Sequence, residues 1–261
     1  MIRWTPRVLA AAALVAAAAA LSCGEVPTLE NGIAYYTTVL LPLPAVALGD
    51  SLRDSLGAAT PLTVRAFTRD SQEITGLTVT FVPTVLPTLV DIKANGMLVA
   101  HDTTVGSVQI VGRIGERLQT SIVTLLVVPQ PTGIARADDP AGDTALAVPA
   151  LKTLPVTVTG SFKNATTTVN GIIVHYRIDS LAPRTAAPGS AILTNAGGTS
   201  LRPDSTIAVD TTKTAGSATR NVLVRAGSGV RRVYISASAT RMKDAKPVSG
   251  SPVHFVVDLK P

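Results

Sequence analysis

The chain is poor in the residues that build disulfides, zinc sites and redox centres. Its 261 residues include one cysteine, Cys23, and three histidines. One cysteine forms no disulfide within the chain, and a structural zinc site uses four Cys or His ligands. The acidic residues Asp138, Asp139 and Asp143 lack the ligand spacing of known calcium loops. We therefore expect no metal and no cofactor. We interpret the acidic residues as a solvated turn, with weak calcium binding as the alternative.

Recognisable catalytic arrangements are also missing from the sequence. It contains no Gly-x-Ser-x-Gly elbow and no His-Glu-x-x-His pair. The segment Gly197 to Ser200 is glycine-rich but lacks the lysine of a phosphate-binding loop. Scattered Ser, His and Asp residues do not amount to a triad. We expect no catalytic residues and a protein that is not an enzyme. A hydrolase with an unfamiliar site is the least favoured alternative.

Charge and aromatic residues are both scarce. Charged residues make up 15% of the chain and aromatic residues 3%, and the formal net charge is +6. The basic residues are scattered, whereas a nucleic-acid surface needs a basic stripe with stacking aromatics. We therefore expect no nucleic-acid partner. The only tryptophan, Trp4, lies near the start, so the core must come from Val, Ile, Leu and Ala. Abundant Thr, Ser, Gly and Pro favour a β-rich exported protein with many turns.

The first residues have the pattern of an export signal. Arg3 and Arg7 precede an uninterrupted apolar run from Val8 to Leu21, which is shorter than the about 20 residues of a membrane-spanning helix. A charged start followed by a short apolar run and small residues is typical of a cleaved signal. The alternative is a buried core helix. Because this segment is apolar on every side, such a helix would need a larger protein around it.

The end of the apolar run resembles a bacterial lipobox. Ala20-Leu21-Ser22-Cys23 places a small residue before the cysteine, although Leu21 stands where a smaller residue is more common. The resemblance implies cleavage after Ser22, acyl chains on Cys23 and a membrane as partner. Gly24, in place of the aspartate that retains such lipoproteins in the inner membrane, implies an outer membrane location, facing the periplasm or the surface. The alternative is ordinary cleavage near Ala20, which leaves an unpaired cysteine that needs another explanation.

Past the leader, apolar residues alternate with polar ones at the period of β-strands. Val174, Tyr176 and Ile178, for example, are separated by His175 and Arg177. Many such runs, split by Gly, Pro, Asn and Asp, indicate antiparallel sandwiches, and no helical period appears.

The segment Pro129-Gln130-Pro131 predicts a stiff joint between two domains. We divide the chain into a signal peptide (1–22), a tether (23–32), a first domain (33–129), a linker (130–131) and a second domain (132–261).

Both domains resemble bacterial Ig-like (Big) domains. In the first, Val90 to Gly96 followed by Gly106 to Val111 is similar to the type-2 pattern. In the second, Asp210 to Ala218 and Ser251 to Val257 are similar to the invasin-like type-1 pattern. The resemblance implies an all-β fold of two tandem Ig-like antiparallel β-sandwiches. It also implies a stalk, an adhesive module or an accessory domain of a surface protein.

One candidate binding patch follows from Ig strand order in the second domain. In that order the strands that carry His175, Tyr234 and His254 lie side by side. Alternation directs these side chains outward, together with Arg177 and Arg232. Such a patch suits an anionic glycan or an envelope protein, although a solvated sheet face is the favoured interpretation because antiparallel sheets normally expose one side.

The sequence thus favours a lipid-anchored, non-enzymatic envelope protein with a structural or adhesive role. The alternative is a glycan- or small-ligand-binding module that uses the patch or the enlarged loops near 181–204.

Overall fold

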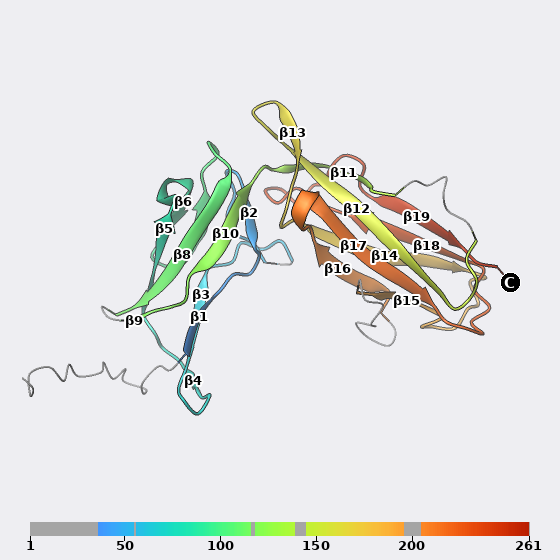
Figure 1. Cartoon of the computed structure of the whole chain (residues 1–261), viewed down its shortest axis with the longest axis horizontal. Helices are drawn as coiled ribbons and strands as arrows, with labels where there is room; N and C mark the ends of the chain where they lie inside the picture. The colour runs from blue at the N-terminus through green and yellow to red at the C-terminus, as the bar shows by residue number, and fades with distance from the viewer. Residues whose placement is uncertain (1–35, 55, 116–117, 139–144, 196–204, 261) are drawn as a thin grey trace, which may run out of the picture.

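The computed structural model describes residues 36–54, 56–115, 118–138, 145–195 and 205–260. These residues form two Ig-like β-sandwiches in tandem, which lie one after the other along the long axis of the molecule (Figure 1). The described elements are strands and short 3₁₀ turns. The signal peptide, Cys23 and the tether lie outside the described residues.

The first sandwich contains two main sheets and a small hairpin. Its strands are β1 (Tyr36–Leu40), β2 (Ala45–Ala47), β3 (Thr63–Phe67), β4 (Glu73–Ile74), β5 (Val79–Val85), β6 (Val90–Ile92), β7 (Leu98–Ala100), β8 (Gly106–Ile114), β9 (Leu118–Gln119) and β10 (Val123–Val128). One sheet has the order β1-β3-β4 and the other β2-β10-β8-β5, with β9 on β8; β6 and β7 pair separately. Strand β2 runs parallel to β10, and the other pairs are antiparallel.

The second sandwich is larger and has two sheets of similar size. Its strands are β11 (Pro131–Arg136), β12 (Ala150–Phe162), β13 (Ala165–Thr168), β14 (Ile173–Ala182), β15 (Ala191–Thr194), β16 (Ile207–Thr211), β17 (Ser217–Val224), β18 (Arg232–Ser238) and β19 (Val253–Asp258). The sheet orders are β11-β12-β17-β15, with β13 on β12, and β16-β14-β18-β19. Pro131, expected in the linker, is the first residue of β11. The predicted domain limits themselves stay a prediction.

The alternation in the sequence explains how the second core forms. Val174 and Tyr176 of β14 are fully buried, and Val233, Ile235 and Ala237 of β18 face them from the neighbouring strand. Tyr176 is among the largest fully buried side chains, and burial raises the pKa of its hydroxyl. Its ring packs with the surrounding aliphatic side chains in the core of the second sandwich.

The apolar segment from Leu118 to Val128 forms two strands, β9 and β10, instead of one. Thr120 lies between them and is buried. Its hydroxyl accepts a hydrogen bond from the Gly112 amide at 2.9 Å and donates one to the Ser121 carbonyl at 3.0 Å. A threonine side chain that bonds nearby backbone groups competes with regular strand pairing, and here it interrupts the ladder.

Candidate functional site

The five predicted patch residues lie on three adjacent strands of one sheet. His175 and Arg177 are on β14, Arg232 and Tyr234 on β18, and His254 on β19, and all five side chains are exposed. The strand order expected from the Ig pattern is therefore present. Whether this surface binds anything stays a prediction.

The register spreads these residues along the sheet instead of gathering them at one point. Arg177 lies opposite Ser236, which in turn lies opposite His254, so these three share one row. His175 lies opposite Ser238, whereas Arg232 lies at the other end of the same strand, opposite Asp258. At about 3.3 Å per residue, the row of Arg232 lies about 20 Å from that of His175. A single small ligand does not span both ends.

Each arginine of the patch is paired with a carboxylate. Arg177 Nε donates to Asp179 Oδ1 at 2.9 Å, and Ser236 Oγ donates to the same oxygen at 3.0 Å. Arg232 Nε donates to Asp258 Oδ1, and this bond together with Tyr234 raises the pKa of the guanidinium. The patch is therefore less basic than the sequence interpretation assumed. Strand alternation could have revealed this, because Asp179 and Asp258 are each an even number of residues from a patch residue on the same strand.

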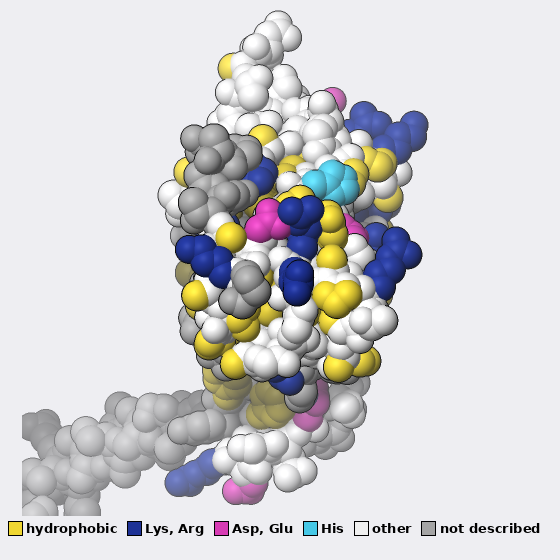
Figure 2. Space-filling view, turned by 90° about the vertical axis from the view of Figure 1, so that its right-hand side faces the viewer, with side chains coloured by type: hydrophobic (Ala, Val, Ile, Leu, Met, Phe, Trp, Pro, Cys, Tyr) yellow, Lys and Arg dark blue, Asp and Glu magenta, His cyan; other side chains and the backbone are white. Residues whose placement is uncertain are grey.

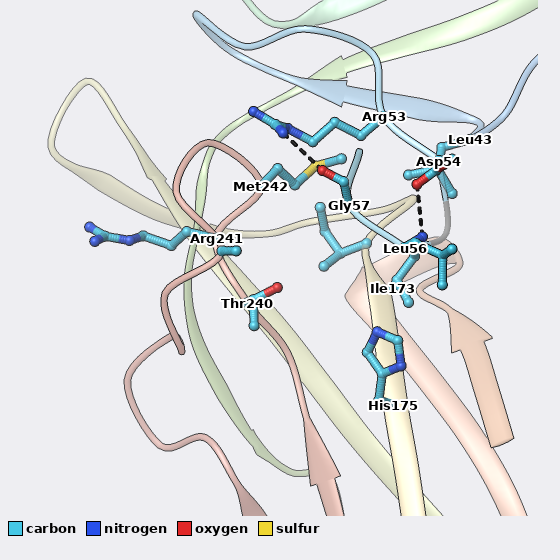
Figure 3. A pocket seen from close by; sticks show the side chains of 12 residues that line it. Leu43, Arg53, Asp54, Leu56, Gly57, Ile173, His175, Thr240, Arg241 and Met242 are labelled. Carbon is cyan, nitrogen blue, oxygen red and sulfur yellow. Dashed lines mark hydrogen bonds between the residues drawn. The ribbon is translucent and has the colours of Figure 1, made fainter. Parts of the chain in front are cut away.

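A second feature is a small hollow where the two sandwiches meet (Figure 3). Its volume is about 80 Å³. Leu43, Arg53 and Leu56 line it from the first sandwich, and Ile173, His175 and Met242 line it from the second. His175 and Thr240 also line a wider hollow of about 400 Å³ on the sheet face, with Ser236, Ser238 and Ser251 nearby. His175 and Thr240 therefore line both hollows, which periodicity alone did not reveal.

His175 is the titratable side chain that lines both hollows. Although His175 is exposed as a residue, the surrounding chain keeps water from part of its ring, and this desolvation lowers the pKa of the imidazole below the ordinary value of about 6.5. Because burial penalises the charged ring only in the folded chain, the unfolded chain binds more protons between the two pKa values.

The free energy of unfolding is therefore expected to fall as the pH drops through about 6.5 toward the folded pKa of His175. Urea unfolding at a series of pH values measures this. His175→Gln should flatten the profile, and equal slopes in both proteins would contradict the expectation.

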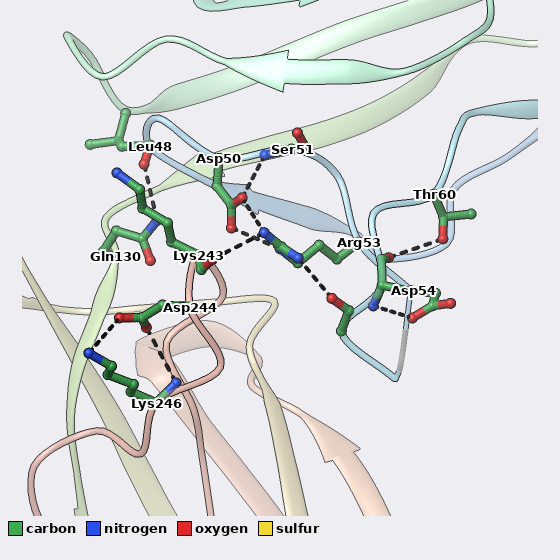
Figure 4. A network of polar contacts seen from close by, with 12 residues as sticks. Leu48, Asp50, Ser51, Arg53, Asp54, Thr60, Gln130, Lys243, Asp244 and Lys246 are labelled. Atoms are coloured by element: carbon green, nitrogen blue, oxygen red, sulfur yellow. Dashed lines mark hydrogen bonds and ion pairs between the residues drawn. The ribbon is translucent and has the colours of Figure 1, made fainter.

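A polar network next to the junction hollow connects the two sandwiches (Figure 4). Asp50 is buried, and its two carboxylate oxygens accept hydrogen bonds from Arg53 Nη2 at 2.8 Å and Nε at 3.1 Å. Arg53 Nη2 also donates to the Lys243 carbonyl of the second sandwich at 3.3 Å. Gln130 Nε2, between β10 and β11, donates to the Leu48 carbonyl at 3.1 Å. The network joins the loop after β2 to the hairpin after β18.

Apolar packing at the junction is equally close. Ala45 of β2 is fully buried and belongs to the core cluster of the second sandwich. Met242 and Ile173, from the second sandwich, pack against the core cluster of the first. A Cβ added to Gly171 would lie 2.2 Å from the Cβ of Ala45, which is closer than real carbon atoms approach. Each sandwich therefore contributes to the core of the other.

Within the described part of the chain, no three His, Cys, Asp or Glu side chains gather as metal ligands would. Across those ranges, no helix has the length and apolar character that crossing a bilayer requires.

No protein-family model matches the sequence, and no curated protein matches it. Solved structures with similar architecture include the D00-D0 domain of intimin, at 13% identity and a TM-score of 0.29, covering 86% of this chain and 100% of that one. Domains 1–6 of the surface layer protein SbsC match at 14% identity and a TM-score of 0.32, covering 88% and 28%. The fibronectin(III)-like modules of Clostridium thermocellum CbhA match at 13% identity and a TM-score of 0.30, covering 86% and 94%. Identities and scores this low do not transfer a function.

Proposed function

We propose that the chain is an exported, lipid-anchored protein of the outer membrane in which two Ig-like sandwiches serve as a rigid structural or adhesive unit. The observation that carries the proposal is the packed junction. Only Pro129 and Gln130 separate β10 from β11. Short proline-containing connectors act as stiff spacers, and the Arg53 network and the Ala45–Gly171 contact hold the sandwiches against each other. Such a unit transmits force or position without bending at its middle, as a stalk or adhesin requires.

The anchor at Cys23 is supported by the leader sequence. Replacing this residue, Cys23→Ala, is expected to remove the acyl chains and release the protein from membranes, since each buried CH₂ contributes about 0.8 kcal/mol to anchoring. The measurement is the share of protein in the membrane pellet after fractionation of cells. Ser22→Ala, which keeps both the cysteine and a small residue before it, is the matched control and should remain in the pellet. Equal retention of Cys23→Ala would remove the basis of the proposed location.

Two further measurements address the role of the anchored protein. Protease treatment of intact cells separates a surface-facing chain, which is cleaved, from a periplasmic one, which is protected. A pull-down from envelope extract tests for protein partners. A structural or adhesive protein should capture envelope proteins, and absence of any partner from repeated extracts would contradict the role.

A second candidate function is recognition of a glycan or small ligand at the sheet face. The hollow of about 400 Å³ favours it, because serine hydroxyls, His175 and Arg177 meet there beside Ile207 and pockets with few polar groups on an apolar base suit small ligands. Arg177 lines this hollow, so replacing it with alanine should weaken binding about tenfold or more, since a hydrogen bond to a charged group contributes about 1.5–3 kcal/mol. A glycan array with both proteins measures this. Unchanged binding of every detected ligand or partner would rule out the patch.

A further inference from the structure

A third hollow lies beside Lys260, and the chain reaches its C-terminus at the end of the second sandwich that points away from the first (Figure 1). The hollow has a volume of about 390 Å³ and lies between the β17–β18 loop, residues 147–148 and Lys260. Backbone bonds hold its parts together. The Arg231 amide donates to the Ala182 carbonyl at 2.8 Å, and the Leu259 amide donates to the Arg231 carbonyl at 2.9 Å. The Lys260 amide donates to the Leu146 carbonyl at 2.8 Å. The bases of both cationic side chains are therefore fixed next to each other.

The cations of this hollow have no carboxylate partner within the described residues. Arg231 and Lys260 both line the hollow and are exposed, and neither forms an ion pair with any described residue, in contrast to Arg177 and Arg232 on the sheet face. Arg184, on the neighbouring loop, is likewise exposed and unpaired among the residues described. Figure 2 looks onto this end and shows more Lys and Arg than Asp and Glu side chains. Unpaired positive charge is therefore present at this tip of the second sandwich.

The loop between β17 and β18 adds backbone donors beside the two cations. Gly227 and Gly229 have φ angles of 69° and 67°, which glycine adopts without strain. Their amides take part in no hydrogen bond with described residues. Tight turns whose amide groups remain unpaired form anion-binding concavities. Val148 and Val230 supply an apolar surface in the same hollow.

We propose that this hollow binds the carboxylate or phosphate group of an acidic saccharide. Arg231, Lys260 and the glycine amides contact the oxyanion, and the valines contact the apolar side of the sugar ring. The hollow falls within the about 300–1,000 Å³ of small-ligand pockets, whereas a stable protein partner needs about 800 Å² of surface on each side. The proposal rests on the proposed envelope function, because an exported chain meets acidic polysaccharides and its tip lies at the end away from the first sandwich.

The test uses the purified full chain and oligogalacturonate as the probe, with calorimetry at two salt concentrations. Wild type should bind, and more weakly at the higher salt concentration, because screening reduces attraction between exposed charges. Arg231→Ala with Lys260→Ala should weaken binding about tenfold or more, as expected for the loss of charge-assisted contacts. Gly229→Ala keeps both cations and should also weaken binding, since alanine is strained at this φ angle. A Cβ there meets no atom within 4 Å, so the fold should be retained.

The matched control removes the same charge from the first sandwich. Lys93→Ala with Arg113→Ala replaces two exposed cations that pair with no described carboxylate, and it should bind like wild type. Equal losses in both double variants would show general charge attraction and overturn the site. The proposal also fails if wild type does not bind the probe, or if inorganic phosphate, phosphatidylglycerol vesicles or single-stranded DNA bind as tightly. Membrane retention through Cys23 is measured separately, so the two proposals fail independently.

Discussion

Replacing Arg53 with alanine is expected to lower the free energy of unfolding of the first sandwich by about 3 kcal/mol. The reason is that the carboxylate of Asp50 then remains buried without its charged partner. The Asp50 side chain is only 4% exposed, and Arg53 supplies two of the three hydrogen bonds it accepts, the third coming from the Ser51 amide at 2.8 Å. Without the guanidinium, Asp50 stays buried with an uncompensated charge. Urea unfolding followed by circular dichroism measures the loss.

A surface pair in the same sandwich provides the control. Arg65 forms a two-bond contact with Glu73, but both side chains are more than 40% exposed. Arg65→Ala should therefore cost less than about 1 kcal/mol, because water solvates the remaining carboxylate. The double variant Asp50→Asn with Arg53→Met should recover most of the loss, since it removes both charges together. A loss that persists in the double variant would mean that the contact with Lys243, and not the buried charge, accounts for the effect.

Replacing Gly171 with alanine is expected to lower the free energy of unfolding by about 2–4 kcal/mol and to change the angle between the sandwiches. Two costs combine. Gly171 has a φ of 77°, where alanine is strained by about 1 kcal/mol. The new methyl group would overlap Ala45 across the junction, and overpacking of a close contact costs about 1–3 kcal/mol. Thermal unfolding measures the stability, and small-angle X-ray scattering measures the arrangement of the sandwiches.

Gly76→Ala is the control that separates backbone strain from steric overlap. Gly76 has a φ of 76°, but a Cβ there meets no atom within 4 Å. This variant should lose only the backbone term, about 1 kcal/mol, and its scattering profile should match that of wild type. If Gly171→Ala gives the same loss and the same profile as Gly76→Ala, the junction is not packed as tightly as described, and the rigid-unit proposal loses its main support.

Strand periodicity was sufficient to predict most of the second sandwich. Apolar residues at every second position of β14, β18 and β19 face the core because successive side chains point to opposite faces of a strand. The same rule placed His175, Tyr234 and His254 on one exposed face. It did not reveal β2 or β11. Strand β2 is short and pairs with β10, which is distant in sequence, whereas β11 begins at a proline and pairs with β12, the next strand in the chain.

The sequence was not sufficient to predict which carboxylate contacts which arginine. Asp179 and Asp258 lie on the expected face. Asp179 contacts Arg177 on its own strand, whereas the contact of Asp258 with Arg232 depends on the register between β18 and β19. The buried pair of Asp50 and Arg53 gives no periodic signal, since both residues lie in a loop. A loop pair of this kind is recognised only when the surrounding chain is seen to exclude water from the carboxylate.

The sequence by itself determined that this protein is all-β, and which residues of its longer strands face the cores, because side-chain alternation is a local property of strands. It also predicts an export signal and a lipid anchor at the start of the chain. Tertiary structure decided how the sandwiches meet and where positive charge remains available. Ala45 and Gly171, or Arg231 and Lys260, become neighbours only when strands distant in sequence pair. Contacts between such residues follow from the register of many strands at once, which no short stretch of sequence encodes.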